Sequence, residues 1–283
     1  MKTVDILNEL KSLFMCIKHN ASIVIVPGTI IMLFERTSNE WNGFRLILGF
    51  VYLFLFIFTF DLSNQINGLT EDIINKPERP LASGNWNLKQ AWRYLIISNV
   101  MLTLSGLVLG ILPYTLAWIA VASFHNFWGH KNWFLKNHIS LTIGAFILLN
   151  SALRISNLNE MPSQIEIMIV SLAGGMGSVT QDFKDINGDK LLERRTLPIM
   201  FDQKIAIIIT AISLTIGYGI FDTYFIFKST NLLTTEVLFF IIILVQILNL
   251  FFLFIGKSQQ DYKTIYDIFK ANFILYVSFL VIV

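Results

Sequence analysis

The side chains best suited to chemistry in this sequence gather in two acidic clusters, of which the first covers residues 64–80. On a helix, Asn64, Gly68 and Asp72 are spaced four residues apart and drift slowly across one face over two turns. This spacing puts an amide oxygen and a carboxylate in line, with a glycine that has no side chain between them. The cluster then runs through basic residues to a proline.

The second cluster covers residues 181–198 and resembles the first in position and chemistry. Asp182, Asp185 and Asp189 fall at i, i+3 and i+7, within about 60° of arc on a helix, so their carboxylates are expected to share one face. Basic residues and a proline follow again. Such a weak internal repeat is typical of membrane proteins whose binding site lies where two related halves meet.

The donor atoms of both clusters favour Mg²⁺, a hard cation that binds through one or two carboxylates plus substrate phosphates. The single cysteine, Cys16, excludes a cysteine-cluster metal site, and no pair of histidines at ligand spacing suggests zinc. Asn64, Asp72, Asp182 and Asp185 are therefore the expected catalytic groups. The expected metal ligands are Asn64, Asp72, Asp182, Asp185 and Asp189.

Basic side chains accompany both clusters and are suited to the non-bridging oxygens of a diphosphate, for which arginine offers a planar bidentate fork. The alternative is that both clusters are solvated loop ends, where Asp and Lys are common. Two matching clusters with shared carboxylate faces favour the binding site. The expected diphosphate ligands are Lys76, Arg79, Lys184, Lys190 and Arg194.

The elements that position these clusters are expected to be membrane helices. Of the 283 residues, 54% are hydrophobic and 14% charged, whereas a soluble domain carries about 25% charged residues. No Pro-, Gly- or Ser-rich linker divides the chain, which predicts a single all-α domain over residues 1–283. Apolar stretches of membrane-spanning length predict about nine transmembrane helices near residues 17–34, 43–62, 92–112, 113–127, 138–155, 163–178, 203–227, 233–256 and 266–283.

The distribution of Lys and Arg predicts how this multi-pass bundle sits in the membrane. With the N-terminus in the cytoplasm, most of the 21 basic residues fall in cytoplasmic loops, as the positive-inside rule requires, and the exceptions are Arg36, Arg45, Arg154 and Lys228. Both acidic clusters then form a rim on the cytoplasmic side. Residues ahead of the first span predict an amphipathic helix on the membrane surface. The small net charge of +2 gives no indication of nucleic-acid binding.

A ligand with a diphosphate head and a hydrocarbon tail would place its head on the acidic rim and its tail inside the bundle. Breaking an allylic carbon–oxygen bond creates an allylic cation and a highly charged leaving group, which metal ions neutralise. The cation requires a dry cavity, where an aromatic face stabilises it by roughly 0.5–2 kcal/mol. The chain has 25 Phe, 8 Tyr and 6 Trp, although Phe is also an ordinary lipid-facing residue.

The two clusters resemble the paired aspartate-rich signatures of the UbiA superfamily of intramembrane prenyltransferases. The resemblance is carried by Asn-Lys-Pro-x-Arg-Pro at residues 75–80 and by Asp182, Asp185 and Asp189 with the trailing Thr-Leu-Pro. Through the helix pattern it extends over essentially the whole chain. It implies nine helices, two Mg²⁺ ions and a prenyl diphosphate substrate.

The first cluster departs from the pattern Asn-Asp-x-x-Asp-x-x-x-Asp that is usual in the superfamily. Asn64 and Asp72 remain, whereas Gln65 and Gly68 replace two aspartates. A central Gly or Ala, with Glu-Asp before Asn-Lys-Pro, resembles the terpene cyclase branch, as does the segment 125–137. That branch ionises a prenyl diphosphate, here expected to be farnesyl diphosphate, and the double bonds of the tail capture the cation.

Two other functions are compatible with parts of the sequence. A prenyltransferase would deliver the tail to an aromatic or lipid acceptor, and the missing carboxylate at Gly68 does not by itself prove cyclisation. A transporter would need ionisable residues deep within its spans, where this sequence has almost none. Gly174, Gly175 and Gly177, ahead of the second cluster, either let the backbone approach the diphosphate or permit close helix packing.

Overall fold

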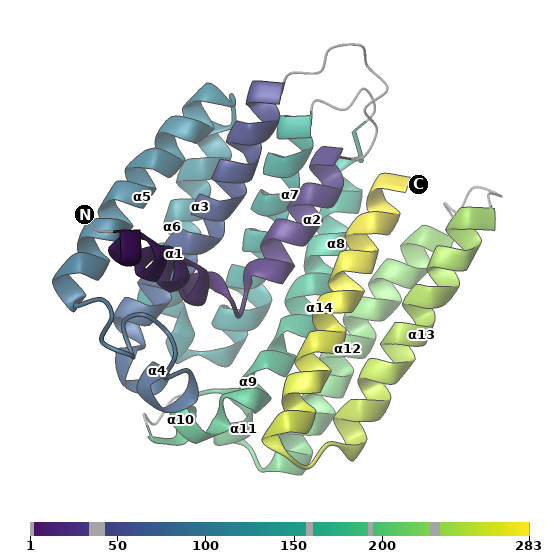
Figure 1. The fold of residues 1–283 in the computed structure, drawn as a ribbon. Helices are drawn as coiled ribbons and strands as arrows, with labels where there is room; N and C mark the ends of the chain where they lie inside the picture. The colour runs from purple at the N-terminus through teal and green to yellow at the C-terminus, as the bar shows by residue number, and fades with distance from the viewer. Residues whose placement is uncertain (1–2, 34–42, 157–160, 192–194, 227–232, 283) are drawn as a thin grey trace.

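The computed structural model describes residues 3–33, 43–156, 161–191, 195–226 and 233–282, and every regular element in these ranges is helical. Long helices run side by side in one bundle (Figure 1). They are α2 (Ala21–Leu33), α3 (Gly43–Asn67), α5 (Leu88–Val108), α6 (Leu112–Phe127), α7 (Thr142–Ser156), α8 (Gln164–Gly177), α12 (Gln203–Ile226), α13 (Leu233–Ile255) and α14 (Gln259–Ile282).

Contacts between the helices join the two ends of the chain. Helix α3 packs against α5 and α6, and α12 packs against α8, while α13 packs on α14. Helix α7 contacts both α2 and α8, and α14 also contacts both α2 and α8. An early helix and the last described helix therefore lie side by side, so residues distant in the sequence can share one cavity.

Fewer helices are long enough to span a membrane than the nine that the sequence predicted. Six helical segments are at least 18 residues long and apolar enough to cross a membrane. The number rises to seven if the segment Ile6–Ile17 and the helix Ala21–Leu33, which meet at a bend, count together as one span. Three of the nine predicted spans correspond to shorter helices, α2 with 13 residues, α6 with 16 and α8 with 14. The all-helical membrane bundle is confirmed, and the count of nine is not.

The break between α5 and α6 lies where the sequence predicted it. Gly110 has a φ of +76°, a left-handed conformation that favours glycine, and it follows Leu109, the residue that caps the end of α5. Pro113 then occupies the first turn of α6, where its missing amide hydrogen costs no helical hydrogen bond. The glycine ends one helix and the proline begins the next.

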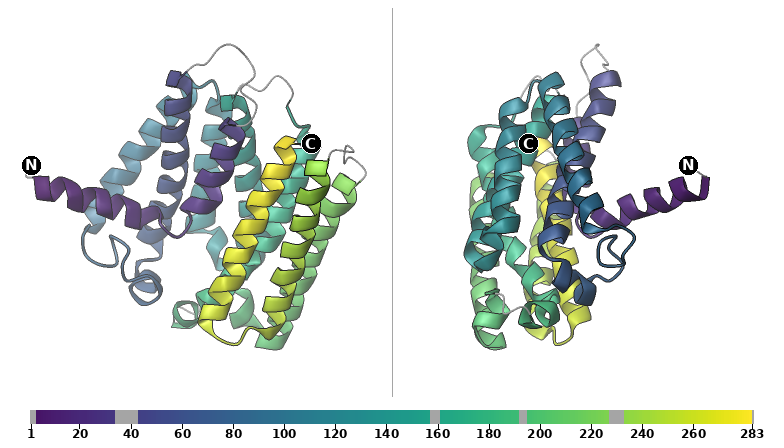
Figure 2. Two further views of the ribbon diagram at one scale, coloured as in Figure 1. Left: turned by 45° about the vertical axis from the view of Figure 1, so that its right-hand side comes forward. Right: turned by 90° about the vertical axis from the view of Figure 1, so that its left-hand side faces the viewer.

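Helix α1 (Thr3–Ile17) lies across the bundle and projects from its side (Figure 2). Its axis is bent by 88° from that of α2. One face is held by Glu9, which accepts hydrogen bonds from Trp86 and Tyr94, while apolar side chains such as Leu7 and Phe14 are exposed. The amphipathic helix is confirmed, and its position on a membrane surface stays a prediction.

The short helices gather at one end of the bundle (Figure 1). They carry both acidic clusters, because α4 (Leu69–Asn75) contains the end of the first and α9 (Gln181–Lys184) and α10 (Ile186–Leu191) contain most of the second. Helix α4 packs directly on α10. The prediction that the two clusters face the same side is confirmed. A further short helix, α11 (Leu197–Met200), follows them.

The glycines of α8 serve close packing. A methyl group added to Gly175 would lie 1.7 Å from Oγ1 and 2.9 Å from Cβ of Thr142 on α7. Gly174 and Gly177 similarly face the rings of Phe273 and Phe269 on α14. Of the two sequence interpretations, the structure therefore supports helix packing, because each glycine accommodates a neighbouring side chain.

Replacing Gly175 with alanine should destabilise the fold. The added methyl group cannot fit beside Thr142 unless α7 and α8 move apart, and such overpacking costs about 1–3 kcal/mol. Thermal unfolding of the purified protein in detergent measures this loss. The matched control is Gly219→Ala on α12, where an added Cβ meets nothing within 4 Å. Equal unfolding temperatures for both variants would contradict the packing.

Candidate active site

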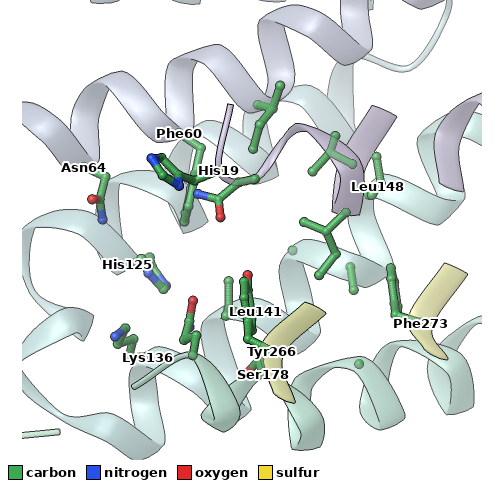
Figure 3. Close-up of a pocket in the computed structure, with 18 of the residues that line it drawn as sticks. His19, Phe60, Asn64, His125, Lys136, Leu141, Leu148, Ser178, Tyr266 and Phe273 are labelled. Carbon is green, nitrogen blue, oxygen red and sulfur yellow. The ribbon is translucent and has the colours of Figure 1, made fainter. Parts of the chain in front are cut away.

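A cavity of about 140 Å³ opens among α2, α3, α6, α7, α8 and α14. Asn64, His125 and Lys136 lie at one side of it, and Leu148 and Phe273 at the other (Figure 3). The cavity therefore has a polar end and an apolar end, and the polar end contains residues from both acidic clusters.

Aromatic rings form the walls of the apolar part. The indole Nε1 of Trp118 donates a hydrogen bond to the carbonyl oxygen of Phe56 at 3.0 Å, and the two rings stack with their centroids 3.8 Å apart. Phe60 stacks on Trp118 as well, at 5.5 Å. Phe269 and Phe273 of α14 also line the cavity. This part of the cavity can enclose a hydrocarbon tail in aromatic surroundings.

Asn64 is oriented by a network that ties α3 to α6. Its Nδ2 donates to Oδ1 of Asn126 at 3.1 Å. Asn126 is buried and in turn donates to the carbonyl oxygen of Phe60 and to Oγ of Ser63. Because the amide nitrogen of Asn64 is bound in this way, its carbonyl oxygen is the atom that can serve a ligand.

The first cluster does not form one continuous helix, because the chain bends at Gly68 between α3 and α4. Beyond the bend, Glu71 lines the cavity, whereas Asp72 does not. Both oxygens of Asp72 instead accept from Nη1 of Arg79, at 3.0 and 2.9 Å. Burial raises the pKa of Asp72, although Arg79 opposes that shift. Asp72 thus holds an arginine that does line the cavity.

A second buried carboxylate, Asp61, supports the same arginine. Its Oδ1 lies 3.7 Å from Nη2 of Arg79 and accepts a hydrogen bond from Asn20 at 2.6 Å. Asn20 belongs to the elbow between α1 and α2 and lines the cavity, as does His19, which contacts Glu78 at 2.8 Å. The elbow is therefore tied to the first cluster by polar contacts.

In the second cluster, Asp182 is fully buried and also holds a cation that lines the cavity. Its two oxygens accept from Lys136 at 2.7 Å and from Asn137 at 2.9 Å. Both partners lie on the π-helical segment η2 (Leu135–Leu141), which precedes α7. Such segments are frequent at functional sites.

Asp185 links the two clusters across the end of the bundle. It lies between α9 and α10, lines the cavity, and is 3.3 Å from the Nζ of Lys76 and 3.8 Å from that of Lys184. Asn75 adds two hydrogen bonds, to the carbonyl oxygen of Asp185 and from the amide of Gly188. The segment that carries the second cluster is thus clamped to the first.

The charges around Asp185 affect one another strongly. Burial opposes ionisation of Asp185, but Lys76 and Lys184 outweigh it and hold its pKa below the usual range. Burial lowers the pKa of Lys184 to about 8, against the attraction of Asp185. The carboxylate is therefore ionised at neutral pH, where it can bind a cation.

The other predicted residues lie farther from the cavity. Asp189 is buried and Lys190 is exposed, and neither lines it. Arg194 lies outside the described residues. The helix is interrupted at Asp185, and of Asp182, Asp185 and Asp189, Asp185 lines the cavity. Of the expected metal ligands, the structure brings Asn64 and Asp185 to the cavity.

Residues at this site that were not among the predicted site residues include Glu71, Lys136, Asp61 and Asn20. Glu71 could have been found, because it is seven residues after Asn64 and thus on the same helix face. Lys136 lies in the segment that resembled the cyclase branch. Asp61 lies on α3 and Asn20 in the elbow between α1 and α2, and nothing in their local sequence signals that they meet.

The donor atoms at the polar end fit Mg²⁺ bound together with phosphate oxygens. Within the described ranges no group of three or more His, Cys, Asp or Glu side chains could hold a metal ion alone. Mg²⁺ typically takes one or two carboxylates plus substrate phosphates. Glu71 and Asp185 supply two carboxylates, and Asn64 and Gln181 add amide oxygens.

Comparison with known proteins identifies relatives of both catalytic kinds. The diterpene cyclase eriG of Hericium erinaceus is 34% identical over 202 residues, which cover 68% of this chain and 65% of that protein, slightly less than two thirds of its length. The polyprenyl transferase eriF of the same fungus is 31% identical over 200 residues, covering 68% of this chain and 69% of that protein.

Solved structures share the whole architecture. A UbiA homolog from Archaeoglobus fulgidus bound to GPP and Mg²⁺ superposes with a TM-score of 0.72 at 15% identity, covering 96% of this chain and all of that one. The sequence model of the UbiA prenyltransferase family matches residues 23–275 of this chain. With a match over most of its length and the same bundle, this chain belongs to the UbiA prenyltransferase family.

Proposed function

We propose that this protein is a Mg²⁺-dependent terpene cyclase that ionises a prenyl diphosphate, with farnesyl diphosphate as its substrate. The observation that carries the proposal is the two-ended cavity, which combines cations and oxygen donors at one end with aromatic walls at the other. This arrangement matches a substrate with a charged head and an apolar tail. The relative eriG, a diterpene cyclase, supports the same reaction type.

The diphosphate would bind at the polar end through side chains that other residues already hold in place. Lys76, Arg79, Lys136 and Lys184 line the cavity there. Asp72 positions Arg79, and Asp182 positions Lys136. Charge-assisted hydrogen bonds to phosphate are among the stronger polar contacts in proteins. The proposed diphosphate ligands differ from those expected from the sequence. Lys136 is added because it lines the cavity, and Lys190 is left out because it is exposed.

The metal would be held by Asn64, Glu71 and Asp185 together with the diphosphate oxygens, with Asp72 and Asp182 orienting the cations beside it. Mg²⁺ bound there would neutralise the charge that develops on the leaving diphosphate. The side chains that remain in contact with the departing group are lysines and an arginine, which retain it at the polar end. The cation is left in the apolar part.

The apolar part would protect the carbocation and direct its cyclisation. Phe56, Phe60 and Trp118 form a stacked aromatic wall, and each aromatic face stabilises a nearby cation by roughly 0.5–2 kcal/mol. Apolar side chains exclude water, so the double bonds of the tail are the nucleophiles within reach. Capture by the tail forms a carbon–carbon bond and leaves a cyclic carbocation, which becomes a neutral cyclic alkene when it loses a proton.

The alternative is a prenyltransferase that passes the tail to an aromatic or lipid acceptor, as the relative eriF suggests. The support for cyclisation comes from the sequence of the first cluster, where Gln65 and Gly68 replace two aspartates of the usual motif. Gln65, which replaces an acidic residue of the usual motif, is fully buried and donates to the carbonyl oxygen and Sγ of Cys16 on α1, so it faces away from the cavity. Neither it nor Gly68 supplies a carboxylate to an acceptor.

We further propose that the polar end and the N-terminus face the cytoplasm, where soluble prenyl diphosphates are available. The long apolar helices fit an integral membrane protein. Lipid then surrounds the bundle, and the substrate reaches the cavity from the side that carries both acidic clusters.

Product analysis tests the proposed reaction directly. The purified protein, incubated with Mg²⁺ and farnesyl diphosphate without any acceptor, should release diphosphate and a cyclic hydrocarbon that gas chromatography–mass spectrometry identifies. Chelation with EDTA should abolish both, because the leaving group then lacks its counter-charge. Diphosphate release that requires an aromatic or lipid acceptor would instead establish the transferase.

Replacing Asp185 with asparagine should lower the rate of diphosphate release by about 10²-fold or more, in line with the loss of one electrostatic contact to a transition state. The change keeps the size of the side chain, and Asn75 still binds the backbone oxygen of residue 185. Glu236→Gln at the start of α13 is the control, since this exposed carboxylate lies far from the cavity. Equal rates for both variants would exclude the assigned role.

Restoring a carboxylate at position 68 tests the cyclase branch. Gly68→Asp should decrease the cyclic product and increase transfer to an added aromatic acceptor, because the first cluster then regains the acidic pattern of the prenyltransferases. Gly68→Asn is the matched control, with the same size and no charge. If both variants keep the wild-type products, the absent carboxylate does not separate the two reactions.

A further inference from the structure

The apolar end of the cavity is closed by a side chain whose position depends on a glycine. Phe273 of α14 lies across the cavity from Asn64 and Lys136, on the same side as Leu148 (Figure 3). It is buried, and its ring faces the backbone of Gly174 on α8. Both residues line the cavity, so their contact forms part of its far wall.

The contact is too close to accept any side chain at position 174. A Cβ built on Gly174 would lie 2.7 Å from Cε2 and 2.8 Å from Cδ2 of the Phe273 ring. Real Cβ atoms do not approach carbon atoms so closely, so the ring would have to move away from α8. Because the ring borders the cavity, this movement would reduce the space at the apolar end.

The part of the lining formed by Trp118 is held in a different way. Trp118 is fixed by its hydrogen bond to Phe56 and by stacking on the same ring. Gly144 of α7 also faces this tryptophan, but an added Cβ would lie 3.0 Å from the ring, a smaller clash. The Trp118 wall is therefore set by a directional bond, whereas Phe273 is set by packing on a glycine.

We propose that the contact between Gly174 and Phe273 determines the depth of the tail cavity, and so selects the length of the prenyl tail and the way it folds. The inference rests on the proposed function, because it assigns the apolar end to the tail. A smaller residue at 273 should move the preference towards longer tails, and a larger residue at 174 should move it towards shorter ones. Neither change alters the groups that hold the diphosphate.

The test is a comparison of tail lengths in three variants. Binding of unreactive thiolodiphosphate analogues with ten, fifteen and twenty carbons is measured by isothermal titration calorimetry. Turnover of the corresponding diphosphates with Mg²⁺ is followed by product analysis. Phe273→Leu leaves more room at the far end, so the preference for the twenty-carbon over the fifteen-carbon analogue should rise about tenfold, the lower range for discrimination by a hydrophobic pocket.

Gly174→Ala should shift that preference towards the shorter tails and change the ratio of cyclic products. The control is Gly219→Ala, an equivalent change on α12 at a place where the added group meets no atom within 4 Å, and it should keep the wild-type preference. Phe273→Leu removes atoms from the wall and adds none, so it reports on the proposal even if Gly174→Ala fails to fold.

Two outcomes are distinguished by using binding and turnover together. If Phe273→Leu keeps the wild-type order of affinities and, where there is turnover, the wild-type products, the proposal about tail depth is overturned. If the wild-type protein binds the analogues but releases diphosphate from none of the substrates, the proposed function fails, and the affinities still decide whether Phe273 sets the tail length.

Discussion

The arrangement of the polar end depends on one constraint, that a charge removed from water must be paired. The free-energy cost of removing a carboxylate or an ammonium group from water is offset only by close charged partners and further hydrogen bonds. The structure meets this requirement with pairs that join different elements, such as Lys76 with Asp185 and Lys136 with Asp182. Each pair also determines where a cation stands at the cavity. The same contacts that make burial tolerable therefore position the groups for an anionic ligand.

Much of the fold could be predicted from the sequence, because hydrophobic runs and helix breakers act locally. Gly110 and Pro113 separate two helices where the apolar pattern alone is continuous. The gathering of both acidic clusters at one end follows from the order of the spans. The span count was less predictable, since α2, α6 and α8 are shorter than the apolar stretches that contain them, and helix length depends on tertiary contacts.

The site was predictable in its chemistry but less so in its geometry. Residue types indicated oxygen donors and basic side chains, and Asn64, Lys76, Arg79, Lys184 and Asp185 do line the cavity. The helices are interrupted at Gly68 and Asp185, and of the three aspartates expected to act together, one, Asp185, lines the cavity. Glu71 lines the cavity and the adjacent Asp72 does not, as expected for neighbours that point about 100° apart on a helix, with Glu71 on the face of Asn64. Partners from separate helices carry no signal in a single sequence.

The contribution of α14 to the cavity has a consequence for biosynthesis. This helix supplies Tyr266, Phe269 and Phe273 to the lining, and it follows every other described helix in the chain. The wall formed by these rings is therefore absent while the earlier helices are already being inserted. The compartment is therefore enclosed only after α14 has left the ribosome and packed against α2 and α8, and because α14 also contacts α9, the segment that carries Asp182 gains this neighbour at the same step.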